Sequence, residues 1–106
     1  MDLTTEQCVT YPKGEGKLST DEAMALLDGL DGWLYDGGNL VKSFKFKDFV
    51  EALAYVNRIA PVAEEQDHHP DIGFGYGYAT IRLSTHSAGG VTRNDFILAA
   101  KIDGLK

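Results

Sequence analysis

Two adjacent histidines lie among acidic residues in the stretch EEQDHHP, which runs from Glu64 to Pro70. An imidazole titrates near neutral pH, so His68 and His69 are candidates for donating and accepting protons. They could also bind a metal ion or be ordinary solvated side chains. A third histidine, His86, lies in a second polar stretch, STHS. The patterns around the three histidines help to decide among these possibilities.

A shared metal ion is the least favoured use of these histidines. All three could in principle join Glu64 or Asp67 in a three-histidine site. Adjacent residues of an extended segment, however, point in opposite directions. The chain also has no His-Glu-x-x-His helix and no cysteine pair. We therefore expect a site without a metal.

The stretch GFGYG, Gly73 to Gly77, has some likeness to a nucleotide-binding glycine loop. The phosphate-binding fingerprint needs Gly-x-Gly-x-x-Gly between a strand and a helix. Here the last glycine comes one place early and another strand is expected to follow. The pattern therefore favours glycines of a hairpin over a phosphate site.

Length, composition and charge predict one soluble domain. The 106 residues suffice for a single core, and no apolar run approaches the roughly 18 residues that cross a bilayer. A formal charge of −6 without a basic stripe disfavours direct nucleic-acid binding. The amino terminus lacks the pattern of a secretion or transit signal. The lone Cys8 fits a reducing compartment, so we expect a cytoplasmic protein.

The first part of the chain predicts an arm followed by a capped helix. Residues 1–17 are polar and show no period, which indicates an extended or mobile arm before a domain at 18–106. Ser19 and Glu22 have the spacing of a capping box, so a helix is expected to follow. Its predicted apolar stripe is Met24, Leu26, Leu27 and Leu30.

The middle of the chain predicts a hairpin, a long helix and a second hairpin. Asp36–Asn39 tolerate the positive φ of a tight turn. From Asp48 the apolar residues take helical spacing: Phe49, Val50, Leu53, Val56, Ile59 and Ala60. Pro61 falls inside this helix, where we expect a kink. The second hairpin turns near Gly77, and its return strand alternates apolar Ala79, Ile81 and Leu83 with polar residues.

A second capping pattern, Thr92-x-x-Asp95, predicts a closing helix. The order is then α-β-β-α-β-β-α, with strand pairs joined by turns too short for a parallel crossover. This order predicts an α+β fold with a four-stranded antiparallel sheet and three helices packed on one face. Pro70 favours an extended His69, which ends the long helix. The loops that carry the three histidines could then meet beside the sheet.

Four stretches, AEEQDHHPDIGFGY, RLSTHSAGGVTRND, GW and FKFKDFVEALAYVNRIA, closely resemble the pterin-4a-carbinolamine dehydratase family. The resemblance spans Leu18 to Asp103. The places of the family signature are filled by Glu64, His68, His69, Pro70, Tyr76, His86 and Asp95. The resemblance implies the fold expected above. It also implies dehydration of 4a-hydroxytetrahydropterin, made by aromatic amino acid hydroxylases, to quinonoid dihydropterin, with neither a metal nor an organic cofactor.

The same resemblance implies roles for the residues around the histidines. Water loss across the C4a–N5 bond needs a proton delivered to the leaving hydroxyl and a proton accepted from N5. His68 and His86 are the acid and base candidates, in either order, and His69 is expected to bind the substrate hydroxyl or ring. Four neighbours are expected to contact the pterin: Asp67, Ser84, Thr85 and Ser87.

Supporting roles are expected for the remaining signature residues. Glu64 and Asp95 are expected to orient imidazoles or cap helices, and for Asp95 the cap alone is an equal alternative. Tyr76 is expected in a pocket wall or in sheet packing, with packing preferred. Relatives often carry arginine just before the final aspartate, whereas this chain has Asn94, with Arg93 one place earlier. An arginine contact to the substrate is therefore not carried over.

Two classes of function follow from the resemblance. The first is an enzyme of tetrahydrobiopterin recycling, coupled to an aromatic amino acid hydroxylase. The second is a non-catalytic interaction module, because family members also serve as dimerisation partners of a transcription factor, and assembly of another enzyme is a related possibility. The complete histidine set favours the enzyme. A homodimer or homotetramer, formed through edge strands or helices, is expected from the family.

Overall fold

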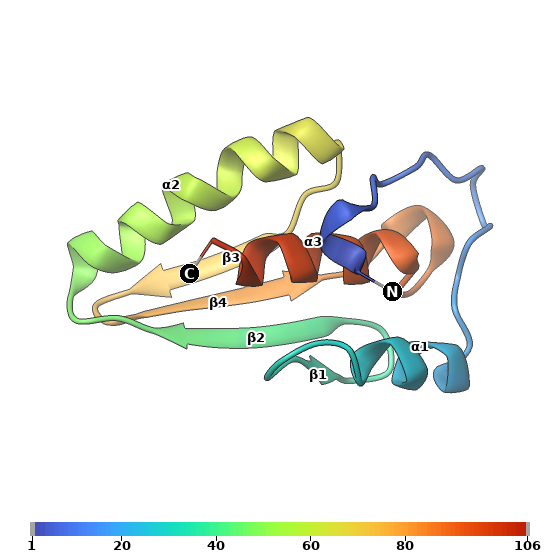
Figure 1. Ribbon diagram of the computed structural model, residues 1–106, viewed down its shortest axis with the longest axis horizontal. Helices are drawn as coiled ribbons and strands as arrows, with labels where there is room; N and C mark the ends of the chain where they lie inside the picture. Colours follow the sequence, from blue (N-terminus) through green and yellow to red (C-terminus); the bar gives the residue numbers. More distant parts are fainter. Residues whose placement is uncertain (1, 106) are drawn as a thin grey trace.

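The computed structural model describes residues 2–105, so the first residue of the expected arm, 1–17, and the last of the expected domain, 18–106, lie outside the described residues. The order of elements confirms the expected α-β-β-α-β-β-α arrangement (Figure 1). The helices and strands are α1 (Thr20–Leu27), β1 (Leu34–Tyr35), β2 (Leu40–Lys45), α2 (Phe49–Gln66), β3 (Asp71–Gly75), β4 (Tyr78–Leu83) and α3 (Arg93–Asp103). Two 3-10 turns, η1 (Leu3–Thr5) and η2 (His86–Ala88), complete the set.

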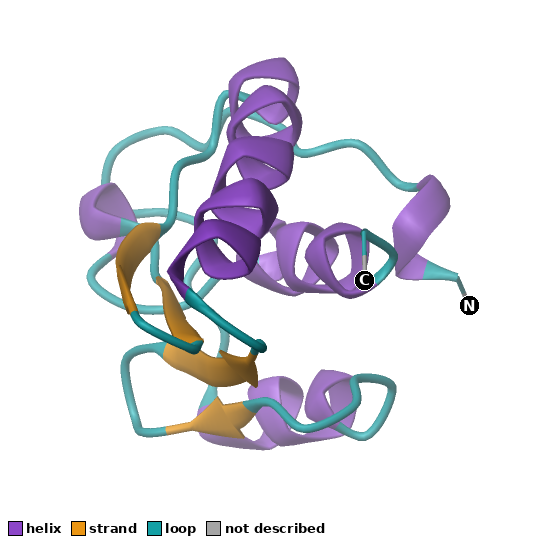
Figure 2. Ribbon diagram, turned by 90° about the vertical axis from the view of Figure 1, so that its left-hand side faces the viewer, coloured by secondary structure: helices purple, strands orange, loops and turns teal. Residues whose placement is uncertain are grey.

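The four strands form one antiparallel sheet in the order β1-β2-β4-β3. Leu40 pairs with Leu83 and Phe44 with Ala79 across the two central strands, and these four residues are buried. Residues one place along point to the opposite face, where Ser43 and Thr80 share a hydrogen bond of 2.9 Å. All three helices lie on the apolar side of the curved sheet (Figure 2), as expected.

The core joins the sheet to α2 and α3. Three side chains of α3 are fully buried: Phe96, Leu98 and Ile102. The hydroxyl of Tyr55 in α2 donates to the carbonyl of Ile102 at 2.7 Å, and its ring packs 4.9 Å from the ring of Phe44. These contacts fix α2 against α3, which matters because His68 lies just past the end of α2 and Asp95 lies in the first turn of α3. Among residues 2–105 no helix is long and apolar enough to cross a membrane.

Helix α2 presents a different face to the sheet than its apolar spacing predicted. The buried residues are Ala52, Tyr55, Ile59, Ala63 and Gln66, whereas Phe49, Val50 and Leu53 are exposed. Ile59 alone of the predicted core set is fully buried. The helix has two apolar faces, and only one of them can pack on the sheet. The helix also continues through Pro61, on its exposed side, and a bend of the axis there stays a prediction.

Helix α1 shows the expected start and most of the expected apolar stripe. Ser19 accepts a hydrogen bond from the amide of Glu22, and the Glu22 carboxylate accepts one from Ser19 in return, so the predicted capping box is confirmed. Leu26, Leu27 and Leu30 of the predicted stripe are partly buried against the core, whereas Met24 is exposed and Ala23 is buried beside it. An eight-residue helix has little more than two turns, so only the side chains on one narrow stripe reach the core.

The residues before α1 form an extended arm that crosses one end of the domain, drawn in blue in Figure 1. The arm begins with η1, where Leu3 is buried, and continues without regular structure to the cap of α1. It passes the carboxyl end of α2 and the first turn of α3, to which it is hydrogen-bonded.

Candidate active site

The end of α2 sets the directions of the two adjacent histidines. Asp67 caps the helix with φ 49° and ψ 42°, a left-handed conformation that is uncommon outside glycine but more accessible to aspartate. Its amide and that of His68 return to carbonyls of the last turn, at Ala63 and Glu64. The chain therefore reverses sharply at this point. His68 then points into the domain and His69 out of it, which confirms that the pair does not share one direction.

The imidazole of His68 is bonded to a buried carboxylate. Its Nε2 lies 2.5 Å from Oδ1 of Asp95, and the side chain of His68 is only 12% exposed. The other carboxylate oxygen, Oδ2, accepts from the hydroxyl of Thr85 at 2.9 Å and from the amide of Thr92 at 2.8 Å. Asp95 thus caps α3 and contacts the imidazole, so both expected uses occur together. A buried carboxylate is tolerated because its oxygens are satisfied by these three bonds.

The protons of this network follow from the donors and acceptors present. An ionised carboxylate only accepts, so the proton of the Thr85 hydroxyl goes to Asp95. In the hydrogen bond of 2.9 Å between the hydroxyls of Thr85 and Thr92, Thr92 is therefore the donor and Thr85 the acceptor. By the same reasoning Nε2 of His68 carries the proton towards Asp95, and in a neutral ring Nδ1 is left with the lone pair.

His69 and His86 have different surroundings from His68. The imidazole of His69 pairs with the carboxylate of Glu64, and both side chains are more than half exposed. His86 begins η2 and is exposed to solvent. Within residues 2–105 no three side chains of the histidine, cysteine, aspartate and glutamate types are grouped to hold a metal ion.

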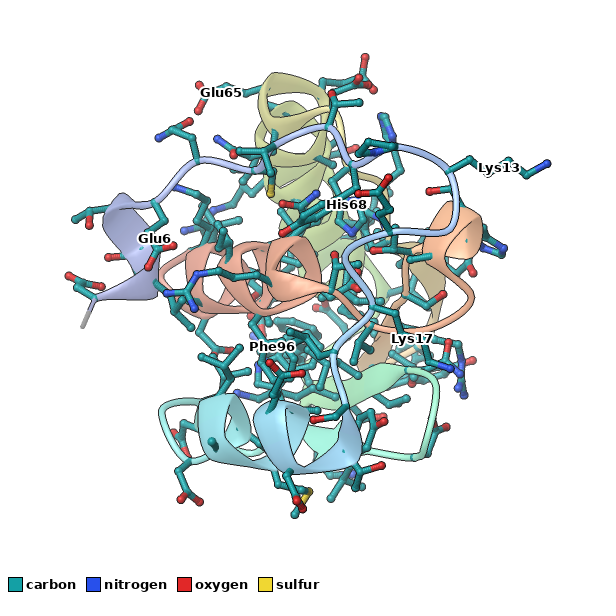
Figure 3. All side chains as sticks on the ribbon, turned by 90° about the vertical axis from the view of Figure 1, so that its right-hand side faces the viewer. Glu6, Lys13, Lys17, Glu65, His68 and Phe96 are labelled. Carbon is teal, nitrogen blue, oxygen red and sulfur yellow. The ribbon has the colours of Figure 1, made fainter. Side chains whose placement is uncertain are left out.

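A hollow of about 350 Å³ lies beside His68, within the usual size range of small-molecule sites. Four predicted residues line it, namely Asp67, His68, Thr85 and Ser87, whereas His69, Ser84 and His86 are not among its walls. Figure 3 shows His68 between the arm and α3. A hollow of about 400 Å³ between η1, α1 and α3 has no histidine in its walls, so the hollow beside His68 is the candidate site.

Tyr76 lies away from this hollow. It occupies the turn between β3 and β4, at the opposite end of the hairpin from Pro70, and its side chain is 77% exposed. The expected packing of Tyr76 in the sheet is therefore not observed in the single chain, because the turn carries the ring into solvent. Pro70 stays at the junction of α2 and β3.

Several residues of the hollow were not expected from the sequence. Cys8, Val9, Thr10 and Tyr11 of the arm line it, together with residues at the ends of α2 and α3, Gln66 and Asn94. The residues of the arm show no apolar periodicity, so nothing in the sequence predicted the arm at this site. Asn94 alone carried a signal, since it departs from the arginine that relatives often have.

Similarity to known proteins extends over most of the chain. Residues 16–105 match the family model described as pterin 4 alpha carbinolamine dehydratase. A protein of Halorhodospira halophila named "Putative pterin-4-alpha-carbinolamine dehydratase" is 44% identical over 107 residues, covering 99% of this chain and 98% of that protein.

Two solved structures are also similar. One, described as a transcriptional coactivator/pterin dehydratase from Brucella melitensis, is 38% identical with a TM-score of 0.79, covering 84% of this chain and 97% of that one. The other, described as a pterin dehydratase-like RuBisCO assembly factor in the alpha-carboxysome, is 29% identical with a TM-score of 0.60, covering 71% and 89%. The extent of the family match and the identity to its curated relatives show that the chain belongs to the pterin-4a-carbinolamine dehydratase family.

Proposed function

We propose that the protein is a 4a-hydroxytetrahydropterin dehydratase, a hydro-lyase that releases water and quinonoid dihydropterin. The observation that carries the proposal is His68, an imidazole held by the buried carboxylate of Asp95 in a hollow of small-molecule size. Membership of the family supplies the substrate class. The reaction needs one base and one acid, and the chain has histidines for both.

In the proposed reaction His68 is the base. Its Nδ1 takes the proton from N5 of the pterin, and Asp95 stabilises the imidazolium that forms, because it already accepts the Nε2 proton. The N5 lone pair closes the N5=C4a double bond while the C4a–O bond breaks. The departing hydroxyl receives a proton from His86 and leaves as water. His86 lies outside the walls of the hollow but, in the sequence, directly between two wall residues, Thr85 and Ser87. His69 binds the substrate, and exchange with solvent restores both protonation states.

The wider role proposed is the recycling of tetrahydrobiopterin in the cytoplasm. An aromatic amino acid hydroxylase would supply the 4a-hydroxy compound, and the dehydratase would remove it without a bound cofactor. The single cysteine, which leaves no intrachain disulfide, is in keeping with a reducing compartment. Asp67, Thr85 and Ser87 would contact the pterin from the walls of the hollow, and Ser84 from beside it.

The test is dehydration of freshly generated 4a-hydroxytetrahydropterin, followed by absorbance. Wild type should accelerate it, and His68→Ala and His86→Ala should each lose about 10²-fold or more, the usual contribution of a positioned acid or base. His69→Ala serves as the matched control, because a binding role predicts a raised KM with kcat largely kept. Circular dichroism must show that all variants fold. A folded wild type that gives no acceleration would refute the proposal.

A second candidate is an interaction module without catalysis. The two similar structures are described with coactivator and assembly roles, and α2 of this chain exposes Phe49, Val50 and Leu53. Exposed apolar side chains grouped on one helix are typical of a surface that another protein covers. Capture of a partner from native extract by the His68→Ala protein, together with an inactive wild type, would favour this candidate over the enzyme.

A further inference from the structure

The arm is held over the site by two buried amide side chains. Asn94 accepts from the amide of Val9 at 3.0 Å and donates to its carbonyl at 2.7 Å. Gln66 accepts from the amide of Cys8 at 2.7 Å and donates to the side chain of Gln7 at 2.8 Å. Both amides are nearly inaccessible to solvent. Lifting the arm would leave two partly enclosed amide groups without these partners, which is unfavourable.

The other end of the arm is tied to the loop that carries His86. The amide of Gly14 donates to the carbonyl of Ser87 at 2.7 Å, and the amide of Leu18 donates to the carbonyl of Val91 at 2.9 Å. Residues 10–13 therefore span the gap between two fixed points, one on α2 and α3 and one at η2. Because Thr10 and Ser87 both line the hollow, the arm crosses it.

Tyr11 is positioned within this crossing by Gly16. A Cβ atom on Gly16 would come within 2.6 Å of the Tyr11 ring, and Gly16 has φ 89°, a conformation that side chains other than glycine rarely adopt. The ring of Tyr11 thus packs directly on the glycine backbone. A half-buried aromatic side chain held in this way loses little further freedom when it contacts a ligand.

We propose that residues 8–11 form one wall of the pterin pocket, that Tyr11 is a substrate-binding residue, and that Gln66 and Asn94 are positioning residues that hold this wall in place. The proposal rests on the proposed function, because it takes the hollow beside His68 as the pterin site. It goes beyond the family match, which begins at residue 16 and so excludes the wall.

The first test measures binding of 7,8-dihydrobiopterin, which lacks the 4a-hydroxyl and cannot react, by titration calorimetry. Tyr11→Ala and Asn94→Ala should weaken binding roughly three- to tenfold, as expected for losing one or two contacts. In turnover the same variants should raise KM by a similar factor with kcat within about twofold. Lys101→Met is the matched control, because Lys101 holds the arm at the carbonyl of Thr4, away from the hollow.

The second test uses Cys8, the only cysteine, as a reporter of arm docking. Its thiol contacts the carbonyl of Asn94 at 3.6 Å, and burial raises its pKa to about 11, so the docked thiol reacts slowly with an alkylating reagent. Asn94→Ala should speed the alkylation of Cys8 several-fold. Lys101→Met should not speed it, because the charge of Lys101 lowers the pKa of Cys8 and its removal can only slow the reaction. Dihydrobiopterin should slow the alkylation of wild type by closing the hollow.

The outcomes separate the two proposals. Weaker binding in Tyr11→Ala and Asn94→Ala, with faster alkylation only in the latter, supports the wall. Wild-type binding that neither variant changes overturns the wall and leaves the dehydratase intact. A fall in kcat as large as the rise in KM in the folded variants also overturns the wall. A wall that only binds substrate changes KM and leaves kcat unchanged. A wild type that binds no pterin and dehydrates none overturns both.

Discussion

At the scale of single residues, Asp95 is the side chain that joins the fold to the proposed chemistry. One of its oxygens contacts His68, and the other satisfies the cap of α3 together with Thr85. The carboxylate is held in place by the first turn of α3, so it can fix the orientation of the imidazole without rearranging. The proposed base is thus pre-positioned in the absence of substrate, which is the condition under which electrostatic stabilisation is most effective.

We predict that Asp95→Asn lowers kcat by about 10- to 100-fold, because the neutral amide cannot stabilise the imidazolium of His68 as a carboxylate does. It should also cost about 1 kcal/mol of folding free energy through the weakened cap. Ser19→Ala is the control for the loss of a helix cap, since it removes the N-cap hydroxyl of α1, away from His68 (Figure 3). Its stability should fall by about 1 kcal/mol with kcat unchanged. Urea denaturation measures the folding free energy of each variant, and steady-state kinetics measure kcat. An equal fall of kcat in Asp95→Asn and Ser19→Ala would contradict the role of Asp95 in stabilising the imidazolium.

At the scale of elements, the arm is fixed near its start by an ion pair. Nε and Nη2 of Arg93 donate to the two carboxylate oxygens of Glu6, both at 2.7 Å, in a paired geometry that favours strong binding. The hydrogen bond from Arg93 lowers the pKa of Glu6 below its ordinary value of 4.5, and the same bond raises the pKa of Arg93. Docking of the arm is therefore linked to pH.

The sign of this linkage follows from the lowered pKa of Glu6. The pair contributes its full stability above pH 4.5, and that contribution is lost as the pH falls through the lowered value. We predict that the stability difference between wild type and Glu6→Gln is constant from neutral pH to about 5 and shrinks towards zero below it. Urea denaturation, followed by the fluorescence of the buried Trp33, measures this stability difference at each pH. Glu15→Gln, which replaces an exposed carboxylate of the arm, is the control. A difference that persists in acid would exclude the pair as its source.

The sequence predicted the elements better than it predicted their faces. Ser19 and Asp95 mark helix starts through local hydrogen bonds, so their positions could be found from spacing alone. The buried face of α2 could not be found in this way, because Val50 and Ile59 are equally apolar and only the packed sheet decides between them. The arm was missed because it docks through the amides of Gln66 and Asn94, which leave no periodic pattern.

The site illustrates the same limit. His68 was singled out because it belongs to a spaced signature, and Asp67, Thr85 and Ser87 because they flank its histidines. The structure brings these four residues to one hollow. His86 and His69 fit that motif equally well, yet they lie on exposed surface in the single chain. Spacing identifies which residues belong to a signature, and tertiary packing decides which of them enclose the same space.

At the scale of the whole molecule, the apolar surface and the site lie at opposite ends of α2. Phe49 begins the helix and packs 5.5 Å from Phe74 of the edge strand β3, while Val50 beside it is 73% exposed. His68 follows the other end of the helix, about 27 Å away along its axis for 18 residues. A second copy of the chain could therefore cover the apolar end without obstructing the hollow.

We predict that the protein self-associates through this apolar end of α2. Light scattering should give a mass two or four times the 11.6 kDa of one chain, and Val50→Glu with Leu53→Glu should reduce it to one. Two buried carboxylates without partners would make the contact unfavourable. Met24→Glu, which changes an exposed apolar residue on α1, should give the same mass in solution as wild type. A wild-type mass of 11.6 kDa would contradict the prediction and would mean that α2 keeps these side chains in water.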